Sequence, residues 1–419
     1  MQHFACNVSR WTWRAKSRKI PSIMSSVNGD DRCPGTVAPP SDRGRAGGEI
    51  GGAFGDLGSF LPHVLGAITV AGLAPVGVLL SFGAFYVASG LFYRVPIPVQ
   101  PMKAVSAVLL TSGLSPGEIA AAGLGLGLIL LVLAVTGAIG WFARVVPQSV
   151  VTGLQLGLGI TLALMSLELM AGLPWLGIAT AGLLLVLLRV PRCPAALVAL
   201  AAAIVMAHSS GVGAAWPALA WAPAWPVLVL PGLGDLERAL GNAVLPQLPL
   251  TLTNAVIVTA ALAHDFYGKR AARATPRNLA LSSGLANLAL APFGALPMCH
   301  GAGGLAAHHR FGARTGMAPV ILGVLLLGLG LVLADQAGRL LAVIPLAAVG
   351  ALLLFSAADL AFSRRLFDAR PSCWPVIAIT AAGTAWADPF WGLLAGGLAE
   401  GARGQILALL RARAGSRPS

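Results

Sequence analysis

The sequence has very little charge for its length. Only 10% of its 419 residues are Asp, Glu, Lys or Arg, whereas 57% are hydrophobic, and the mean hydropathy is +0.81. A water-soluble domain needs a polar and charged surface, so this composition excludes one. Several apolar runs reach the roughly 18 residues that indicate a membrane helix, which predicts a polytopic, all-α membrane protein.

Cysteine and acidic residues are scarce as well. The five cysteines, at positions 6, 33, 193, 299 and 373, show no CxxC spacing, which argues against a disulfide framework and a zinc site. The 15 acidic residues stand against 28 lysines and arginines, giving a formal net charge of +13. In a soluble chain this charge would suggest nucleic acid, but here it must first be tested against the positive-inside rule. We expect a lipid bilayer as the partner, with no nucleic acid, metal or cofactor.

The N-terminal stretch lacks the apolar core of a secretory signal. Residues 1–46 are polar and basic, which predicts a disordered cytoplasmic tail. Met24 is an alternative start to Met1. A second, short cytoplasmic tail is expected at 411–419.

Fourteen apolar segments follow the tail in two sets of seven. The first repeat occupies 47–208 and the second 245–410. Between them, 209–244 is rich in Trp, Pro and Ala and predicts an extracytoplasmic or interfacial loop, with a short amphipathic piece at Asp235–Asn242. The predicted segments lie near 49–70, 76–93, 98–112, 117–141, 147–170, 173–189, 194–208, 245–264, 277–293, 299–310, 317–336, 342–362, 371–387 and 390–410.

The basic residues alternate with these segments. With both termini in the cytoplasm, the cytoplasmic connections contain most of the Lys and Arg, whereas the outer connections retain Arg238 and Arg339. The residues assigned to the cytoplasmic side are Arg94, Arg144, Arg189, Arg192, Lys269, Arg270, Arg273, Arg277, Arg310, Arg314, Arg364, Arg365, Arg370, Arg403, Arg411, Arg413 and Arg417. This pattern predicts an inner (plasma) membrane protein with both ends inside.

Two proline positions recur in both halves. Pro98 corresponds to Pro297 at an offset of 199, and Pro147 corresponds to Pro345 at an offset of 198. Because seven is odd, two such halves lie inverted relative to each other in the membrane. Inverted repeats with discontinuous helices place the substrate near the midplane, between the ends of the half-helices.

Two stretches break the apolar pattern, Val95–Lys103 and Ala295–Gly304. A residue before proline is driven out of the helical region, so each break should begin as extended backbone and a helix should start near Met102 and near Gly301. The N-terminus of a helix has free N–H groups and a partial positive charge, which suits an anion. Lys103 adds a full charge, and Gly301, Gly303 and Gly304 allow an oxyanion to approach the backbone. As an alternative, Lys103 pairs with Asp56 or Glu118, and the glycines allow close helix packing.

Further polar residues are candidates for the same site. Gln100 and Cys299 occupy matching positions in the two breaks, and His300 lies inside the second break. Asp56, in a glycine-rich segment, is either a proton-coupling group or a partner of Lys103. Gln247, Thr251 and Asn254 recur at helical spacing, which predicts a polar face that lines the cavity or bonds between helices.

Three stretches carry a resemblance to a known family. They are Gly55–Gly58 (GDLG), Pro96–Lys103 (PIPVQPMK) and Cys299–Ala306 (CHGAGGLA), the last continued by Phe311–Gly316 (FGARTG). They resemble the signatures of MOT1-type molybdate transporters, a distant branch of the sulfate permease superfamily. The resemblance runs from about residue 50 to about residue 362. The two longer motifs are specific, whereas GDLG alone is weak.

The resemblance implies a core domain and a gate domain in a fold of two inverted seven-segment repeats, with molybdate uptake as the activity. Gln100 and Lys103 match the first motif, and His300–Gly304 match the second. The sequence differs from sulfate permeases in ending shortly after the last segment. Regulation through a soluble STAS domain is therefore not expected.

We expect an importer of a tetrahedral oxyanion that works by alternating access, with molybdate first and sulfate, of the same shape and charge, second. Gln100, Lys103 and the Gly301–Gly304 backbone would hold the anion, with Asp56 and Gln247 lining the site. A coupling cation, proton or sodium, is expected on charge grounds. A homodimer is compatible with the sequence.

Three other functions are weighed against this one. A nucleobase–proton symporter of the same fold would favour an acidic residue in the eighth segment, where the sequence has Gln247 and Asn254. A membrane enzyme using Cys299, His300 and His308 would need a converging acid–base pair. A channel would differ by showing neither saturation nor counterflow.

Overall fold

The helices of the computed structural model follow the predicted apolar segments. The structure describes residues 42–141, 147–190, 193–217, 223–333 and 335–415. In the first half the elements are α1 (Asp42–Ala53), α2 (Leu57–Leu65), η2 (Gly66–Val70), α3 (Pro75–Tyr93), β1 (Gln100–Pro101), α4 (Lys103–Ser112), α5 (Pro116–Thr136), α7 (Gln148–Ala171), α8 (Pro174–Leu187) and α9 (Ala195–Ser209).

The second half repeats this order after a helix that has no counterpart in the first. Its elements are α10 (Leu233–Ala239), η3 (Leu240–Val244), α11 (Leu245–Leu250), η4 (Thr251–Val258), α12 (Thr259–Tyr267), η5 (Gly268–Ala271), α13 (Pro276–Leu290), η6 (Ala291–Phe293), β2 (Met298–Cys299), α14 (Ala302–Arg310), α15 (Met317–Leu333), α16 (Asp335–Leu341), α17 (Leu346–Ala361), α18 (Arg364–Phe367), η7 (Pro371–Cys373), α19 (Trp374–Trp386) and α20 (Pro389–Gly415).

Each of the fourteen predicted segments coincides with a helix or a run of helical turns in these residues. Six of the described helices are long and apolar enough to cross a membrane by themselves, and shorter apolar helices lie between them. The all-α membrane architecture is therefore confirmed. The number of fourteen spans stays a prediction.

Three predicted boundaries need correction. Helix α1 begins at Asp42, so 42–46 are helical rather than part of the N-terminal tail. Helical backbone begins at Leu233, inside the predicted loop 209–244, because α10, η3 and α11 run on without a break. Helix α20 extends to Gly415, into the stretch expected to be a C-terminal tail. The predicted N-terminal tail at 1–41 lies outside the described residues.

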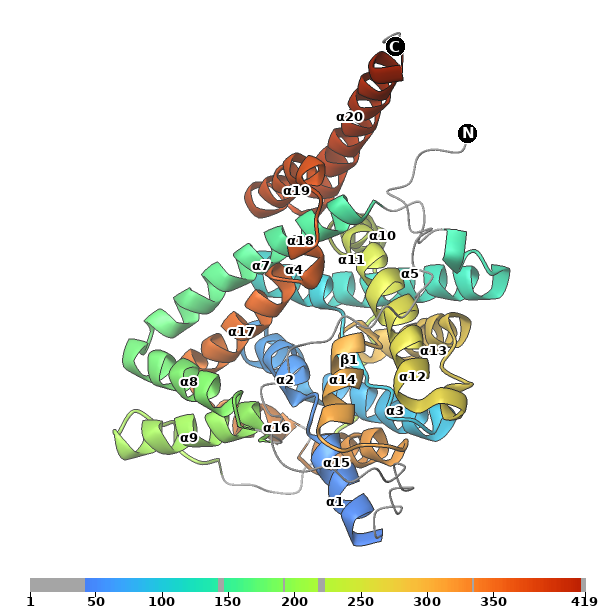
Figure 1. The fold of residues 1–419 in the computed structure, drawn as a ribbon. Helices are drawn as coiled ribbons and strands as arrows, with labels where there is room; N and C mark the ends of the chain where they lie inside the picture. Colours follow the sequence, from blue (N-terminus) through green and yellow to red (C-terminus); the bar gives the residue numbers. More distant parts are fainter. Residues whose placement is uncertain (1–41, 142–146, 191–192, 218–222, 334, 416–419) are drawn as a thin grey trace, which may run out of the picture.

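The helices form two bundles. Helices α1–α5 and α10–α16 make the core bundle, in which α3 packs along α15 and α5 along α13. Helices α7–α9 and α17–α20 make the gate bundle, in which α7 packs against α17 and α19. Figure 1 shows the gate helices on one side of the molecule, with α20 projecting from one end. Each bundle combines helices from both halves of the sequence, as two interlocked repeats would.

Glycine allows the closest helix contacts. A Cβ at Gly83 would lie 2.9 Å from the carbonyl oxygen of Gly323, and one at Gly316 would lie 2.0 Å from that of Gly90. These pairs bring the backbones of α3 and α15 into contact. Such small-residue contacts are the common way for helices to associate in lipid, where apolar side chains gain little by leaving the solvent.

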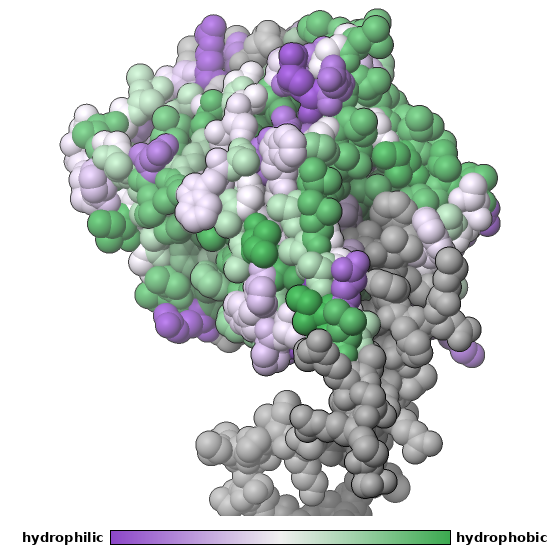
Figure 2. All heavy atoms as spheres, turned by 90° about the horizontal axis from the view of Figure 1, so that it is seen from above, coloured by the Kyte–Doolittle hydropathy of each residue, from purple (hydrophilic) through white to green (hydrophobic). Residues whose placement is uncertain are grey.

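The outside of the molecule is apolar. Ile178 on α8 and Val205 on α9 are each 66% exposed, and many other large apolar side chains are exposed as well. Figure 2 shows such residues covering much of one face, with polar residues gathered in small groups. Apolar exposure on this scale would promote aggregation in water, whereas a bilayer accommodates it.

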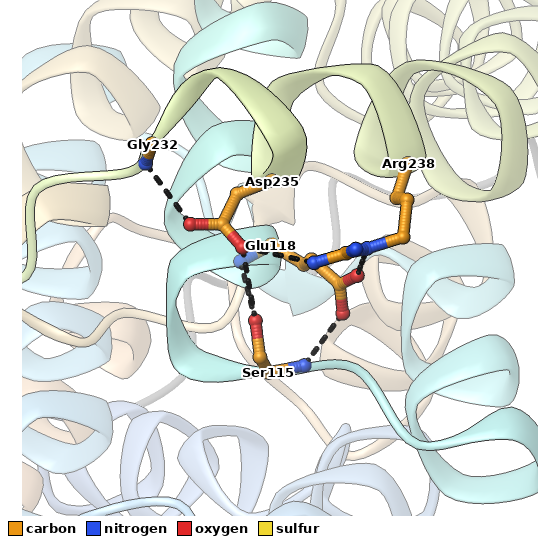
Figure 3. Close-up of polar contacts among 5 residues, drawn as sticks. All are labelled: Ser115, Glu118, Gly232, Asp235 and Arg238. Carbon is orange, nitrogen blue, oxygen red and sulfur yellow. Dashed lines mark hydrogen bonds and ion pairs between the residues drawn. The ribbon is translucent and has the colours of Figure 1, made fainter.

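A polar network fixes the start of α5 to the start of α10 (Figure 3). Ser115 and Glu118 form a capping box, with Ser115 N donating to Glu118 Oε2 at 2.7 Å and Glu118 N donating to Ser115 Oγ at 3.1 Å. Arg238 reaches across from α10 to Glu118 on α5 and also pairs with Asp235, three residues earlier on α10. Asp235 in turn accepts from the backbone N–H of Gly232 at 2.9 Å. The connection before α5 and the connection before α10, both predicted to lie outside, therefore meet at one end of the molecule.

The opposite end joins connections that were predicted to be cytoplasmic. Arg273 donates to the Phe92 carbonyl oxygen at 2.8 Å, and Arg270 donates to the Arg314 carbonyl oxygen at 3.5 Å. These contacts bring the connections after α3, α12 and α14 together. The arrangement agrees with the predicted alternation of basic residues, while the side that faces the cytoplasm stays a prediction.

Candidate substrate site

The two breaks cross each other inside the core bundle. Strands β1 and β2 pair antiparallel, with Gln100 opposite Cys299 and Pro101 opposite Met298. The backbone N–H of Met102 donates to the Pro297 carbonyl oxygen at 2.8 Å and extends the pairing by one residue. Extended backbone at this depth is tolerated because protein surrounds it: every residue from Val95 to Met102 is buried.

The pairing matches the internal repeat. Gln100 and Cys299, 199 positions apart, lie opposite each other, as expected if a pseudo-two-fold axis passes through this pair. The second pair of matching prolines also holds equivalent positions, because Pro147 and Pro345 are the N-cap residues of α7 and α17. The breaks and the repeat that the sequence predicted are thus both present.

Asn287 on α13 supports the second break. Its Nδ2 donates to the Met298 carbonyl oxygen at 2.6 Å, and its Oδ1 accepts from the Met298 N–H at 2.9 Å. In an antiparallel pair, alternate residues point their backbone groups away from the partner strand. Met298 holds such a position, and Asn287 binds its two backbone groups as a third strand would.

Helices α4 and α14 begin on either side of the crossing. Met102 and Gly301 are their N-cap residues, and both have extended backbone. Neither cap supplies a side-chain hydrogen bond, so the first turn of each helix depends on other acceptors for its N–H groups. The two electropositive helix ends predicted from the sequence are therefore formed, and they lie beside the same short ribbon.

Gln247 occupies the N-terminus of α4. Its Oε1 accepts from the backbone N–H of Ala104 at 2.8 Å and from that of Val105 at 3.4 Å. Its Nε2 donates to Thr251 Oγ1 at 2.8 Å. Gln247 was expected to line the cavity; it instead caps α4 from the eighth segment.

The predicted polar face of Gln247, Thr251 and Asn254 assumed the spacing of an α-helix. The backbone from Thr251 to Val258 is a π-helix, whose turn is wider than that of an α-helix. A spacing of three residues turns through a smaller angle there, so a common face for Thr251 and Asn254 does not follow from their spacing. The α-helical spacing assumed for this segment is wrong at this point.

Asp56 lies in a buried cradle between the two breaks. It is 1% exposed, and its Oδ1 accepts from Gln100 Nε2 at 2.6 Å, while Oδ2 has no hydrogen-bond partner. A Cβ at Gly304 would lie 2.4 Å from Asp56 Oδ2, and a Cβ at Gly301 would lie 1.9 Å from Gln100 Oε1. Gly301 and Gly304 thus leave room for the Asp56–Gln100 pair, and a side chain at either position would overlap it.

Lys103 has a partner that the sequence analysis did not name. Its Nζ lies 2.7 Å from Asp359 Oδ2, on α17 of the gate bundle. The alternatives considered for it, Asp56 and Glu118, are wrong: Asp56 bonds to Gln100, and Glu118 bonds to Ser115 and Arg238.

His300 is held by the fold on both ring nitrogens. Nδ1 lies 2.8 Å from the Pro98 carbonyl oxygen, and Nε2 lies 2.8 Å from Ser282 Oγ. Tyr93 extends the chain with its hydroxyl 2.7 Å from the same serine oxygen. His300 thus ties the second break to the first and to α13. Cys299 is buried beside it at the two-fold position.

A cavity of about 490 Å³ lies between the two bundles. From the core bundle, Ser59, Gly303 and Arg310 line it; from the gate bundle, Ser356 and Asp359 do. Of the predicted site residues, Gly303 contributes to this lining, whereas Gln100, Lys103 and Asp56 lie beyond it. A Cβ at Gly303 would meet nothing within 4 Å, so this glycine faces the open space.

Sequence reasoning missed Asp359, Ser356, Asn287 and Ser282. Asp359 is an acidic residue inside an apolar segment, which is a usable signal. The other three are short polar residues whose roles depend on which helices pack together. Their sequence context does not distinguish them from ordinary helix-packing positions.

The glycines of α14 give a matched test of this geometry. Gly304→Ala is expected to lower the free energy of unfolding by about 1–3 kcal/mol, because the new methyl group overlaps the Asp56–Gln100 pair. Gly303→Ala is expected to leave stability unchanged, because its methyl group enters open space. Unfolding of both purified variants in the same detergent, followed by intrinsic fluorescence, measures the difference. Equal stabilities would contradict the cradle.

Two solved transport proteins share the architecture. The transmembrane domain of the bicarbonate transporter BicA from a cyanobacterium matches with a TM-score of 0.63 over 82% of this chain and 96% of that domain, at 18% identity. Murine SLC26A9, an anion transporter solved in the inward-facing state, matches with a TM-score of 0.63 over 90% of this chain and 69% of that chain, at 14% identity. The fold of this chain is therefore the one that these two polytopic membrane proteins share.

The chain belongs to the molybdate transporter family. The family model described as "Molybdate transporter of MFS superfamily" matches residues 48–162 and 239–360, which include both breaks. Molybdate transporter 2 of Arabidopsis thaliana is 30% identical over 390 residues, covering 78% of this chain and 83% of that protein. Molybdate transporter 1 of Chlamydomonas reinhardtii is 30% identical over 429 residues, covering 75% and 83%. The resemblance seen in the sequence is confirmed, and the protein is an anion transporter rather than an enzyme.

Proposed function

We propose that this protein imports a tetrahedral oxyanion, with molybdate as the first candidate and sulfate as the second. The observation that carries the proposal is the crossing of β1 and β2, where the N-termini of α4 and α14 lie beside Lys103. The partial positive charge at the N-terminus of α14 and the ammonium group of Lys103 suit a dianion, whereas the N–H groups of Ala104 and Val105 on α4 already bond to Gln247. The names of the relatives favour molybdate.

The proposed roles of the site residues follow from their contacts. Lys103 and the backbone of Gly301–Gly304 would bind the anion, with the Gln100 amide beside them. Asp56 orients Gln100, and Gln247 with Thr251 sets the start of α4. Cys299 and His300 would form the wall of the site at the crossing, and Asn254 would line the site from η4.

Alternating access would come from movement of the gate bundle against the core bundle. The cavity between them is lined by Arg310 and Cys193, which belong to connections predicted to be cytoplasmic. If basic connections lie inside, this cavity opens toward the cytoplasm and the structure is inward-facing. The proposed location is the inner or plasma membrane, with both termini inside.

Cation coupling completes the proposal. Moving a dianion inward against a negative-inside potential costs about 4.6 kcal/mol per 100 mV. Each proton or sodium ion carried in the same direction would offset half of this cost, so two would offset it fully. Uptake driven separately by a pH gradient and by a sodium gradient tests which one is used.

Direct titration tests the substrate. We expect the purified protein to bind molybdate and tungstate with similar affinity and sulfate more weakly, and sealed proteoliposomes to accumulate labelled molybdate with saturation and counterflow. Binding should also slow alkylation of the buried Cys299 thiol, because the anion would lie at the crossing. Absence of binding to all three ions would overturn the proposal. Flux without saturation or counterflow would indicate a channel.

A further inference from the structure

A seam of polar contacts joins the two bundles beside the site. Lys103 on α4 pairs with Asp359 on α17, as described above. One turn further along α4, Ser106 Oγ lies 2.9 Å from His63 Nδ1, and His63 Nε2 lies 2.6 Å from Ser356 Oγ on α17. Ser106 follows Lys103 by three residues and Ser356 precedes Asp359 by three, so both links lie on one face of each helix.

Asp359 stands between the cavity and Lys103. Asp359 and Ser356 line the cavity, but Lys103 does not. The exposed fraction of the side chain is 69% for Asp359 and 23% for Lys103. An anion that comes through the cavity would therefore meet a carboxylate before it could reach the ammonium group.

The Asp359 carboxylate bonds to Lys103 as a substrate oxygen would. A carboxylate oxygen 2.7 Å from Nζ has the distance of a strong charge-assisted hydrogen bond, which an oxyanion would also make. The ammonium group has three N–H donors, but two anions in contact with it repel each other. Substrate binding at Lys103 is therefore favoured when Asp359 leaves.

We propose that Asp359 is an internal anion that competes with the substrate for Lys103 and sets how tightly an anion must bind to displace it. This inference rests on the proposed function. While Asp359 is paired with Lys103, the affinity of every anion is lowered by the same factor, the fraction of molecules in which Lys103 is free. A tetrahedral dianion, which interacts more strongly with Lys103, still binds, whereas a monoanion of the same shape falls below the affinity needed to be retained.

The competition also couples binding to movement. Asp359 belongs to the gate bundle and Lys103 to the core bundle, so breaking the pair removes one link between them. Binding energy is then available only in the arrangement in which α17 has moved away from α4. This is the differential affinity for two states that a coupled transition needs.

Tungstate and perrhenate provide the probe, because these tetrahedral ions have similar size and differ by one unit of charge. We expect Asp359→Asn to bind both ions about tenfold more tightly than the wild type and by the same factor, because the competitor is removed for both. A carboxylate that merely repelled anions nearby would instead weaken tungstate more than perrhenate. Asp359→Glu, which keeps the charge, should retain the wild-type affinities. Asp265→Asn, at an exposed acid on α12, is the matched control for net charge. Equilibrium dialysis of the full chain in nanodiscs, with the metals counted by mass spectrometry, gives both affinities.

A second measurement does not depend on the substrate. Cys193 lines the cavity, and its alkylation rate in the absence of anions reports how freely the bundles separate. We expect Asp359→Asn and Ser356→Ala to be alkylated several times faster than the wild type and Asp265→Asn. Unchanged affinities for both ions together with unchanged alkylation would overturn the inference. If the wild type binds no oxyanion, the proposed function fails, and the alkylation rates alone decide whether the seam holds the bundles.

Discussion

Replacing Lys103 with alanine is expected to weaken molybdate binding by about 100-fold or more. Truncating one partner of a hydrogen-bonded charge pair in a buried setting costs roughly 2–5 kcal/mol, and each 1.4 kcal/mol corresponds to about tenfold in affinity. The fold should survive, because the partner left behind, Asp359, is 69% exposed and remains solvated. Isothermal titration with molybdate, alongside a thermal unfolding curve, measures both quantities.

Lys269 provides the control for this change. It is exposed in η5, outside both breaks, and Lys269→Ala removes the same charge. Its affinity for molybdate should equal that of the wild type. If Lys103→Ala keeps wild-type affinity while its unfolding curve is unchanged, Lys103 does not bind the anion and the proposed site is wrong.

Gln100→Glu is expected to abolish oxyanion binding and to destabilise the core bundle. The change is nearly isosteric, but it places a second carboxylate within hydrogen-bond distance of Asp56. Two like charges about 4 Å apart repel by about 4 kcal/mol at an effective dielectric constant of 20. The same new charge would repel a dianion at the crossing. Loss of binding and a lower unfolding midpoint are the expected readouts.

The exchanged pair separates these two effects. In the double variant Asp56→Asn with Gln100→Glu, an amide can again donate to a carboxylate, so stability should return toward the wild-type value. Binding should stay weak, because the negative charge now lies at position 100. Gln405→Glu, at an exposed position on α20, controls for the added charge. A double variant no more stable than Gln100→Glu would contradict the role given to the Asp56–Gln100 hydrogen bond.

The features that could be predicted from the sequence are those with a local cause. Proline removes a backbone donor and restricts the residue before it, so the breaks at Pro98 and Pro297 were visible in the sequence. Apolar runs of sufficient length located the helices. The nearly equal offsets of two proline pairs, 199 and 198, predicted the inverted repeat, and with it the matching positions of Gln100 and Cys299.

The features that could not be predicted depend on how the bundles pack. Lys103 and Asp359 are separated by 256 positions, and the pair forms only because α4 and α17 meet at the boundary between core and gate. Gln247 caps α4 for the same reason, although its helical spacing indicated a cavity-lining face. The π-helical turn at Thr251–Val258 is a third case. Nothing in the spacing of its polar residues distinguishes it from an α-helix.

The two hydrogen bonds from Asn287 to the Met298 backbone hold the β1–β2 ribbon in place. A binding site formed by such a fixed backbone would not change its shape to fit the ion that it binds. Ions of equal charge would then be ranked by diameter and by the energy needed to strip their water, not by adaptation of the protein. Tungstate should inhibit molybdate uptake with nearly the affinity of molybdate itself. The smaller sulfate would make fewer contacts in the same site and bind more weakly.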